Sequence, residues 1–214
     1  ICAGYKQHMI KQWFSDYALY TSDVTFDFTK EKPEERMIVH DRHTEPWRVT
    51  VVNTGLETMT GGRIKRVQPY IGHEAFMMTY GDAVTDVNIA ELVHRYKEAG
   101  KLAMVTAVHP TARFGEIQID EEDYVCSFKE KPQLNQGWIN GGFFVLSPKV
   151  FNYIDGDQTT FEAEPLERLT AEGQLKTYRH EGFWQCMDTL QENGMVTTDF
   201  IPTEGKTAKY YRLA

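Results

Sequence analysis

Apolar residues alternate with polar ones in some parts of the chain and form continuous runs in others. They alternate at 24–28 and across 37–52, which is typical of strands with one exposed face. Continuous apolar runs at 75–80, 102–108 and 139–146 predict further strands, and the first of these is expected to be buried and to lead into a loop. The chain is therefore expected to contain a sheet.

Apolar residues at helical spacing predict helices between these strands. In residues 6–20 the spacing predicts an amphipathic helix, with Trp13 and Phe14 in the core. Residues 89–96 place apolar side chains on one helical face, and Asp86 is expected to be the N-cap of that helix.

A third helix is predicted over residues 160–172, closed by Gly173. Glu162 and Glu164 are expected in its first turn, where the helix dipole favours carboxylates. A central region that alternates strand, helix and strand predicts α/β layering, with a largely parallel sheet and some antiparallel additions.

Composition narrows the function classes further. The 214 residues are 41% hydrophobic and 25% charged, as in an ordinary globular protein. The net charge of −8 argues against a protein that binds duplex nucleic acid. No apolar run approaches the length of a membrane span. Three widely spaced cysteines without a C-x-x-C motif indicate reduced thiols and a cytoplasmic protein.

Two aspartates follow apolar stretches that are far apart in the sequence. Asp82 comes after the run 75–80 and Gly81, and Asp188 comes after residues 183–187. Ligands of α/β proteins gather beyond the carboxyl ends of strands, and Mg²⁺ prefers one or two carboxylates together with substrate phosphates. Either aspartate alone also fits a turn or a helix cap. Together they predict metal-templated phosphoryl or nucleotidyl transfer.

Two further segments offer groups that suit a sugar phosphate. Glu130 and Lys131 stand before Pro132, which ends a strand. A carboxylate accepts from sugar hydroxyls and an ammonium meets a phosphate as a point charge; a solvated strand end is the alternative. Asn140 offers a donor and an acceptor to hydroxyls, and the glycine pair that begins at Gly141 indicates either a close approach to the backbone or a β-bulge.

Two glycine-containing loops also offer contacts, one to a phosphate and the other to a sugar. The turn at 60–62 precedes a helix and offers free backbone N–H groups to an anion. The neighbouring Arg63 suits a phosphate in fork geometry. Gly115 would let a sugar approach the backbone, although an ordinary loop glycine explains it as well.

Taken in chain order, these segments resemble one family. VTVVNTG, MTGGRIKRV, TYGD, RFGEI, FKEKP, INGGFFVL and FWQCMDTL are similar to motifs of the sugar-1-phosphate nucleotidyltransferases, and the first two, with the EPW before them, are most similar to the bacterial glucose-1-phosphate cytidylyltransferases. The resemblance implies a Rossmann-like α/β fold with a mixed, mainly parallel sheet flanked by helices and additional antiparallel strands. It implies a nucleotidyltransferase domain over residues 1–190 and leaves 191–214 as an unassigned tail.

The resemblance also implies a reaction and its participants. CTP and α-D-glucose 1-phosphate would give CDP-glucose and pyrophosphate, for dideoxysugar synthesis in surface polysaccharide, with Mg²⁺ as cofactor. The partners would be these substrates and further copies of the chain in the cytoplasm, with no nucleic acid or membrane. Asp82 and Asp188 would hold Mg²⁺, and Lys131 would meet the sugar phosphate. The other substrate contacts would come from Thr58, Arg63 and Gly81 for the nucleotide, and from Gly115, Glu130, Asn140, Gly141 and Lys131 for the sugar phosphate.

The sequence departs from the family pattern in two places. No segment matches the glycine-rich strand–loop–helix and Lys-Pro pair with which the family opens, so the chain is expected to bear an N-terminal truncation, to bind sugar phosphate poorly and to turn over slowly. Residues 191–214 do not match the helical segment that ends the family. Other readings stay open: a transferase using UTP, dTTP or GTP, a metal-dependent glycosyltransferase, or a non-catalytic oligomerising relative.

Overall fold

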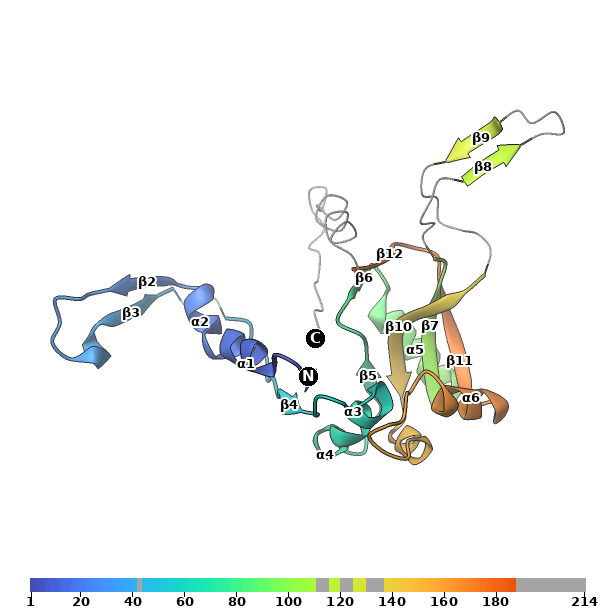
Figure 1. Cartoon of the computed structure of the whole chain (residues 1–214), viewed down its shortest axis with the longest axis horizontal. Helices are drawn as coiled ribbons and strands as arrows, with labels where there is room; N and C mark the ends of the chain where they lie inside the picture. The colour runs from blue at the N-terminus through green and yellow to red at the C-terminus, as the bar shows by residue number, and fades with distance from the viewer. Residues whose placement is uncertain (42–43, 111–115, 120–124, 130–136, 188–214) are drawn as a thin grey trace.

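A four-stranded sheet in the order β11-β7-β10-β5 forms the centre of the main body (Figure 1). The computed structural model describes residues 1–41, 44–110, 116–119, 125–129 and 137–187. Strands β7 (Ala103–Val108) and β11 (Leu175–His180) are parallel, and β10 (Ile139–Leu146) runs antiparallel to both β7 and β5 (Phe76–Met78). Three strands thus share one direction and β10 is reversed, as a mixed sheet was expected to show.

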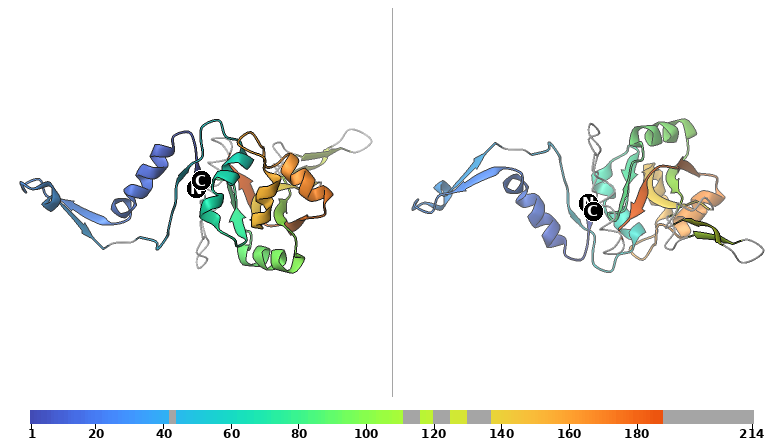
Figure 2. Two further views of the ribbon diagram at one scale, coloured as in Figure 1. Left: turned by 90° about the horizontal axis from the view of Figure 1, so that it is seen from below. Right: turned by 90° about the horizontal axis from the view of Figure 1, so that it is seen from above.

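Alternate residues of the central strands supply two separate cores. On one face, Val105, Phe144 and Leu146 pack with the 3₁₀ helix η2 (Pro148–Tyr153) and α6 (Glu164–Ala171). On the other face, Met104 and Val145 pack against α5 (Ile89–Ala99). Figure 2 shows the helices on both sides of the sheet. The continuous apolar runs of β7 and β10 follow from this arrangement, since both faces of the sheet are covered.

Helix α5 begins later than predicted. Asn88 is its N-cap and accepts a hydrogen bond from the Glu91 N–H at 3.0 Å, while Gly100 ends the helix with φ 59°. Asp86 was expected to be the cap, and this was wrong. Asp86 lies between β6 and the helix, where its N–H donates to the Phe183 carbonyl at 3.2 Å.

Several short pairs of strands surround the central sheet. Strand β6 (Ala83–Thr85) pairs antiparallel with β12 (Trp184–Cys186), and β1 (Cys2–Ala3) pairs parallel with β4 (Val52–Asn53). Strands β8 (Glu116–Ile119) and β9 (Val125–Lys129) also pair antiparallel. Helices α3 (Thr60–Arg66) and α4 (Gln68–Ile71) connect β4 to β5.

An arm projects from this body and buries no side chain (Figures 1 and 2). It consists of α1 (Gln7–Ser15), α2 (Tyr17–Tyr20), β2 (Asp23–Phe26), the 3₁₀ helix η1 (Pro33–Glu35) and β3 (Met37–His40). None of the described residues from 5 to 50 is buried. The expectation that Trp13 and Phe14 lie in the core was therefore wrong: Trp13 is 45% exposed and its ring contacts Phe14 and Tyr17 within the arm, and Phe14 is only half-buried.

In the described part of the chain, no helix combines the length and the apolar composition that crossing a membrane requires.

Candidate active site

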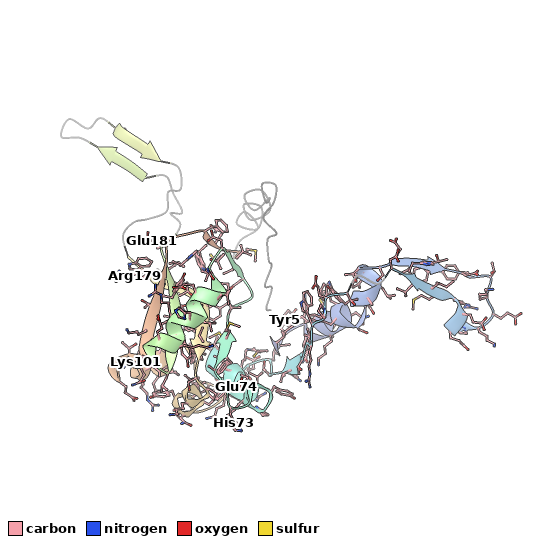
Figure 3. All side chains as sticks on the ribbon, turned by 180° about the vertical axis from the view of Figure 1, so that it is seen from behind. Tyr5, His73, Glu74, Lys101, Arg179 and Glu181 are labelled. Carbon is pink, nitrogen blue, oxygen red and sulfur yellow. The ribbon has the colours of Figure 1, made fainter. Side chains whose placement is uncertain are left out.

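The carboxyl ends of β7 and β11 point toward one end of the body, where Asp82 and Asn140 lie. Figure 3 labels Arg179 and Glu181 at this end of β11, and Lys101, which precedes β7, at the opposite end. Strands β6 and β12 lie at the same end as Arg179 (Figure 1). Ligands of α/β folds bind in this position, because loops converge there and leave backbone groups accessible.

Strand pairing brings the two predicted aspartate segments together. Ala83 lies opposite Cys186 in the β6–β12 ladder, and the Met187 N–H donates to the Asp82 carbonyl at 2.6 Å. Asp82 is exposed, so its carboxylate oxygens are accessible to a hard cation. Asp188 lies outside the described residues. Among the described residues, no three His, Cys, Asp or Glu side chains gather as a metal site.

Tyr80 lies two residues after the end of β5 and is hydrogen-bonded to Glu162, which the sequence analysis placed in the first turn of a helix. Its hydroxyl donates to Glu162 Oε1 and accepts from Asn140 Nδ2 at 3.4 Å. Burial raises the pKa of the Tyr80 hydroxyl well above its ordinary value, and the Glu162 carboxylate raises it further, since both disfavour a phenolate.

Glu162 is not in the first turn of a helix, as had been expected. Helix α6 begins at Glu164, and Glu162 instead turns its Oε2 toward Thr60, whose hydroxyl donates to it at 2.5 Å. The Thr60 hydroxyl oxygen also accepts from the Phe161 N–H at 2.9 Å. Tertiary hydrogen bonds hold the Glu162 carboxylate in this position, whereas helix propensity alone had predicted a place in the first turn of a helix. Its sequence signal was weak because a lone glutamate before a helix fits both roles.

The glycine pair after Asn140 combines a bulge with a close approach. The register of β10 against β7 shifts between Asn140 and Phe144. Gly142 has φ +82°, and a Cβ there would lie 2.6 Å from the Tyr80 ring; a Cβ on Gly141 would lie 2.8 Å from Val108. The Gly142 N–H donates to Asn140 Oδ1 at 2.9 Å. The groups that approach the backbone in this structure are thus the Tyr80 ring at Gly142 and the Val108 side chain at Gly141.

The turn at 60–62 differs from the open anion cradle that was predicted. Helix α3 already includes both glycines, which are buried against residues 157–159. The Gly62 N–H donates to the Thr159 carbonyl at 3.3 Å, so this group is not free for a phosphate. The glycines are required for packing, because a Cβ on Gly61 would lie 2.6 Å from the Thr159 oxygen.

Arg63 and Thr58 lie at the border between α3 and the β1–β4 pair. The Arg63 guanidinium donates to Thr54 Oγ1 at 2.8 Å and to the Leu56 carbonyl at 3.2 Å. Thr58 is buried at 8% exposure, next to Gly55. Three further predicted contacts, Gly115, Glu130 and Lys131, lie outside the described residues; Lys129 ends β9 just before the last two.

A histidine–carboxylate pair that the sequence analysis missed supports β6 and β12. His180 Nε2 lies 2.9 Å from Asp86 Oδ1 and 3.2 Å from the Phe183 carbonyl. The same carbonyl accepts from the Thr85 hydroxyl at 2.7 Å. A Cβ on Gly182 would lie 2.6 Å from both Asp86 and His180, so the loop closes tightly over the pair. These contacts join β11 to the connection after β6. Gly182 was the available signal, but glycine in a loop has many causes.

Comparisons with known proteins agree with this architecture. The family model described as "Nucleotidyl transferase" matches residues 3–191. A glucose-1-phosphate cytidylyltransferase of Salmonella typhi is 49% identical over 193 residues, covering 90% of this chain and 73% of that protein. A probable glucose-1-phosphate cytidylyltransferase of Bacillus subtilis is 41% identical over 189 residues, covering 88% of this chain and 72% of that one.

Among solved structures, HddC from Yersinia pseudotuberculosis superposes with a TM-score of 0.61 at 19% identity, covering 92% of this chain and 76% of that one. A likeness at this identity concerns the fold, and it confirms the predicted nucleotidyltransferase architecture. The family model and the sequence relatives go further, since they match most of the chain. This chain belongs to the nucleotidyl transferase family, among the relatives of the glucose-1-phosphate cytidylyltransferases.

Proposed function

We propose that this chain catalyses cytidylyl transfer from CTP to α-D-glucose 1-phosphate, giving CDP-glucose and pyrophosphate. A phosphate oxygen of the sugar attacks the α-phosphorus of CTP, a new P–O bond forms, and the bond to pyrophosphate breaks in line. The relatives named as glucose-1-phosphate cytidylyltransferases support the substrate pair. The observation that carries the proposal is the hydrogen bond from the Met187 N–H to the Asp82 carbonyl at 2.6 Å, because it places the residue before Asp188 beside Asp82.

Asp82 and Asp188 would hold a Mg²⁺ ion. The donor chemistry fits, since Asp82 presents accessible carboxylate oxygens next to a strand pair that ends at Cys186. Mg²⁺ would supply charge neutralisation at the phosphates. The protein's own work is to bind and orient the two substrates, because positioning lowers the barrier of a displacement between two bound reactants.

The substrate contacts are proposed by motif. Lys131 would pair with the sugar phosphate, and Arg63 would approach the nucleotide phosphates from α3. Asn140, which is exposed at the start of β10, is open to sugar hydroxyls. The remaining proposed contacts are Thr58 and Gly81 with the nucleotide, and Gly115, Glu130 and Gly141 with glucose.

The proposed reaction is tested by following label from γ-³²P-CTP into pyrophosphate, with Mg²⁺ and glucose 1-phosphate. We expect release that depends on both substrates, and the highest kcat/KM for CTP in a panel with UTP, dTTP and GTP. Mannose 1-phosphate serves as the matched sugar control. A higher kcat/KM for another nucleotide, or no pyrophosphate with any pair, would contradict the proposal. Consumption of CDP-glucose to free CDP without pyrophosphate would indicate a glycosyltransferase instead.

We further propose that copies of this chain assemble through the arm. Its exposed apolar side chains include Phe26 at 56%, Phe28 at 81% and Ile38 at 49% exposure. An isolated two-stranded hairpin is marginally stable in water, so β2 and β3 need a covering surface. A second copy of the arm provides one without requiring another kind of protein, and the arm shows no excess of one charge: seven Lys and Arg stand against eight Asp and Glu in residues 5–50.

Light scattering coupled to gel filtration tests the assembly. We expect a mass that is a multiple of 24.7 kDa, and a shift toward the single-chain mass for Phe28→Lys, because a lysine in a packed apolar contact loses its hydration. Glu34→Lys in η1 also adds a lysine to the arm but removes no apolar side chain, so its mass should match the wild type. Equal masses for both variants and the wild type would rule out an interface at Phe28.

A cytoplasmic location and a role in dideoxysugar synthesis complete the proposal. Cys2 is a free thiol, which agrees with a reducing compartment. Burial raises the pKa of the Cys2 thiol, so this residue stays protonated and unreactive. CDP-glucose would then serve as the precursor of dideoxysugars for surface polysaccharide.

A further inference from the structure

We propose that Glu162 is a positioning residue that sets the orientation of the Asn140 amide through the hydroxyl of Tyr80. This inference rests on the proposed function, in which Asn140 binds the sugar. Glu162 would act through Tyr80: its two carboxylate oxygens accept hydrogen bonds from protein groups, Oε2 from Thr60 and Oε1 from Tyr80.

The carboxylate is held in place from two distant parts of the chain. Thr60 lies 102 residues before Glu162, and Tyr80 lies 82 residues before it. The neighbouring Phe161 is fully buried, and its N–H donates to the Thr60 hydroxyl oxygen at 2.9 Å. The backbone beside Glu162 and the hydroxyl that donates to it are therefore fixed by the same threonine, which leaves the carboxylate little freedom to turn away from Tyr80.

The direction of each hydrogen bond follows from the donors available. A carboxylate only accepts, so the single hydroxyl proton of Tyr80 is directed to Glu162. The Tyr80 oxygen can then only accept, and the group within reach is Asn140 Nδ2 at 3.4 Å. At the other end of the amide, Asn140 Oδ1 accepts from the Gly142 N–H at 2.9 Å. A flipped amide would place two donors face to face at Gly142, and would place its oxygen against a hydroxyl whose proton points elsewhere.

The fixed side-chain amide of Asn140 can still make hydrogen bonds to a ligand. One Nδ2 proton and one Oδ1 lone pair stay available on Asn140, which is exposed at the start of β10. A sugar hydroxyl beside Asn140 can accept a hydrogen bond from Nδ2 and donate one to Oδ1. Because the amide is fixed, the sugar can make both hydrogen bonds in only one orientation. Loss of the Glu162 carboxylate frees the Tyr80 proton, and the amide then loses one of the two constraints that select this orientation, while the Gly142 N–H remains as the other.

Kinetics with both substrates test the role of Glu162. We expect Glu162→Ala and Tyr80→Phe each to raise KM for glucose 1-phosphate roughly tenfold, the effect of about one lost hydrogen bond, with KM for CTP changed less than twofold. The double variant should match either single variant, because both break the same chain of hydrogen bonds. Glu162→Gln keeps an acceptor for Tyr80 and should restore most of the affinity. Glu164→Ala is the control, since this exposed residue pairs only loosely with Arg168 at 3.8 Å.

A second measurement separates the hydrogen-bond chain from the proposed function. The side-chain amide of Asn140 is observed by NMR in ¹⁵N-asparagine-labelled protein and assigned from its loss in Asn140→Ser. We expect its resonances to shift in Glu162→Ala and in Tyr80→Phe, and to stay in place in Glu164→Ala. Unshifted resonances in both variants would overturn the inference even if the enzyme is active. Shifted resonances in a protein that does not use glucose 1-phosphate would leave the hydrogen-bond chain standing and overturn the proposed function.

Thermal unfolding by circular dichroism shows which variants are folded. If Glu162→Ala is unfolded, Tyr80→Phe and Glu162→Gln carry the test, since both keep the side-chain volume. Equal losses in KM for CTP, KM for glucose 1-phosphate and kcat would show a structural role only, and would overturn the inference.

Discussion

Asp82→Asn is expected to lower kcat of the cytidylyl transfer roughly a hundred- to a thousandfold, because it removes a full charge from the proposed metal site, which would stabilise charge on the transferred phosphate. The side chain is exposed, so its neutral isostere should leave the thermal midpoint within about 1 °C of the wild type, as surface changes usually do. The loss would therefore be chemical and not structural.

Metal binding gives this variant a readout that does not depend on turnover. The electron paramagnetic resonance signal of free Mn²⁺, measured during a titration with CTP present, should show weaker binding by Asp82→Asn and by Asp188→Asn. The double variant should lose little more than either one, since both carboxylates would serve one ion. Asp155→Asn, another exposed aspartate, is the matched control and should bind Mn²⁺ normally. Undiminished Mn²⁺ binding by Asp82→Asn would refute the shared metal site.

Gly142→Ala is expected to lower the free energy of unfolding by about 2–4 kcal/mol. Two costs add at this position. An alanine at φ +82° costs about 1 kcal/mol or more, and a methyl group 2.6 Å from Tyr80 Cδ2 overpacks the site by about 1–3 kcal/mol. The ring has little room to retreat, since its hydroxyl is bonded to Glu162 and its edge packs on Phe144 at 6.2 Å between centroids.

Two other glycines separate these costs in urea denaturation. Gly100 also has a positive φ, +59°, but open space at its Cβ position, so Gly100→Ala should show the backbone cost alone, about 1 kcal/mol. Gly156 has open space and no positive φ, and Gly156→Ala should be neutral or slightly stabilising. If Gly142→Ala were no worse than Gly100→Ala, the close contact with Tyr80 would carry no energetic weight.

The sequence predicted well those elements whose residues are buried on both faces. The apolar runs that became β7 and β10 were recognised because a strand covered on both sides has no polar face to confuse its pattern. The run at 75–80 also formed a strand, β5, but the expectation that it is buried was wrong, because β5 lies at the edge of the sheet and Met77 is 56% exposed. The same pattern failed for the arm. Trp13 and Phe14 belong to an apolar pattern typical of a buried helical face, yet neither is buried, because periodicity shows that a face is apolar and not what lies against it.

Motif order was the sequence's strongest information about function, and the family model confirms the family it indicated. Individual roles were less accessible. Asp86 had the composition of a helix cap but pairs with His180, and Glu162 had that of a helix first turn but bonds to Thr60 and Tyr80. In both cases a partner roughly a hundred residues away competes with a local role for the same carboxylate, and local sequence cannot rank the two.

The sequence by itself determined the alternation of strands and helices, the family, and the residue types available for a sugar phosphate, a nucleotide and a metal. Only the tertiary structure decided which of them meet. The β6–β12 ladder brings Met187 to Asp82 across more than a hundred residues, and the β10 bulge turns Asn140 toward Tyr80. Such meetings depend on strand register and on the fit of a ring over a glycine, which are properties of packing between distant segments and leave almost no trace in the local pattern of either one.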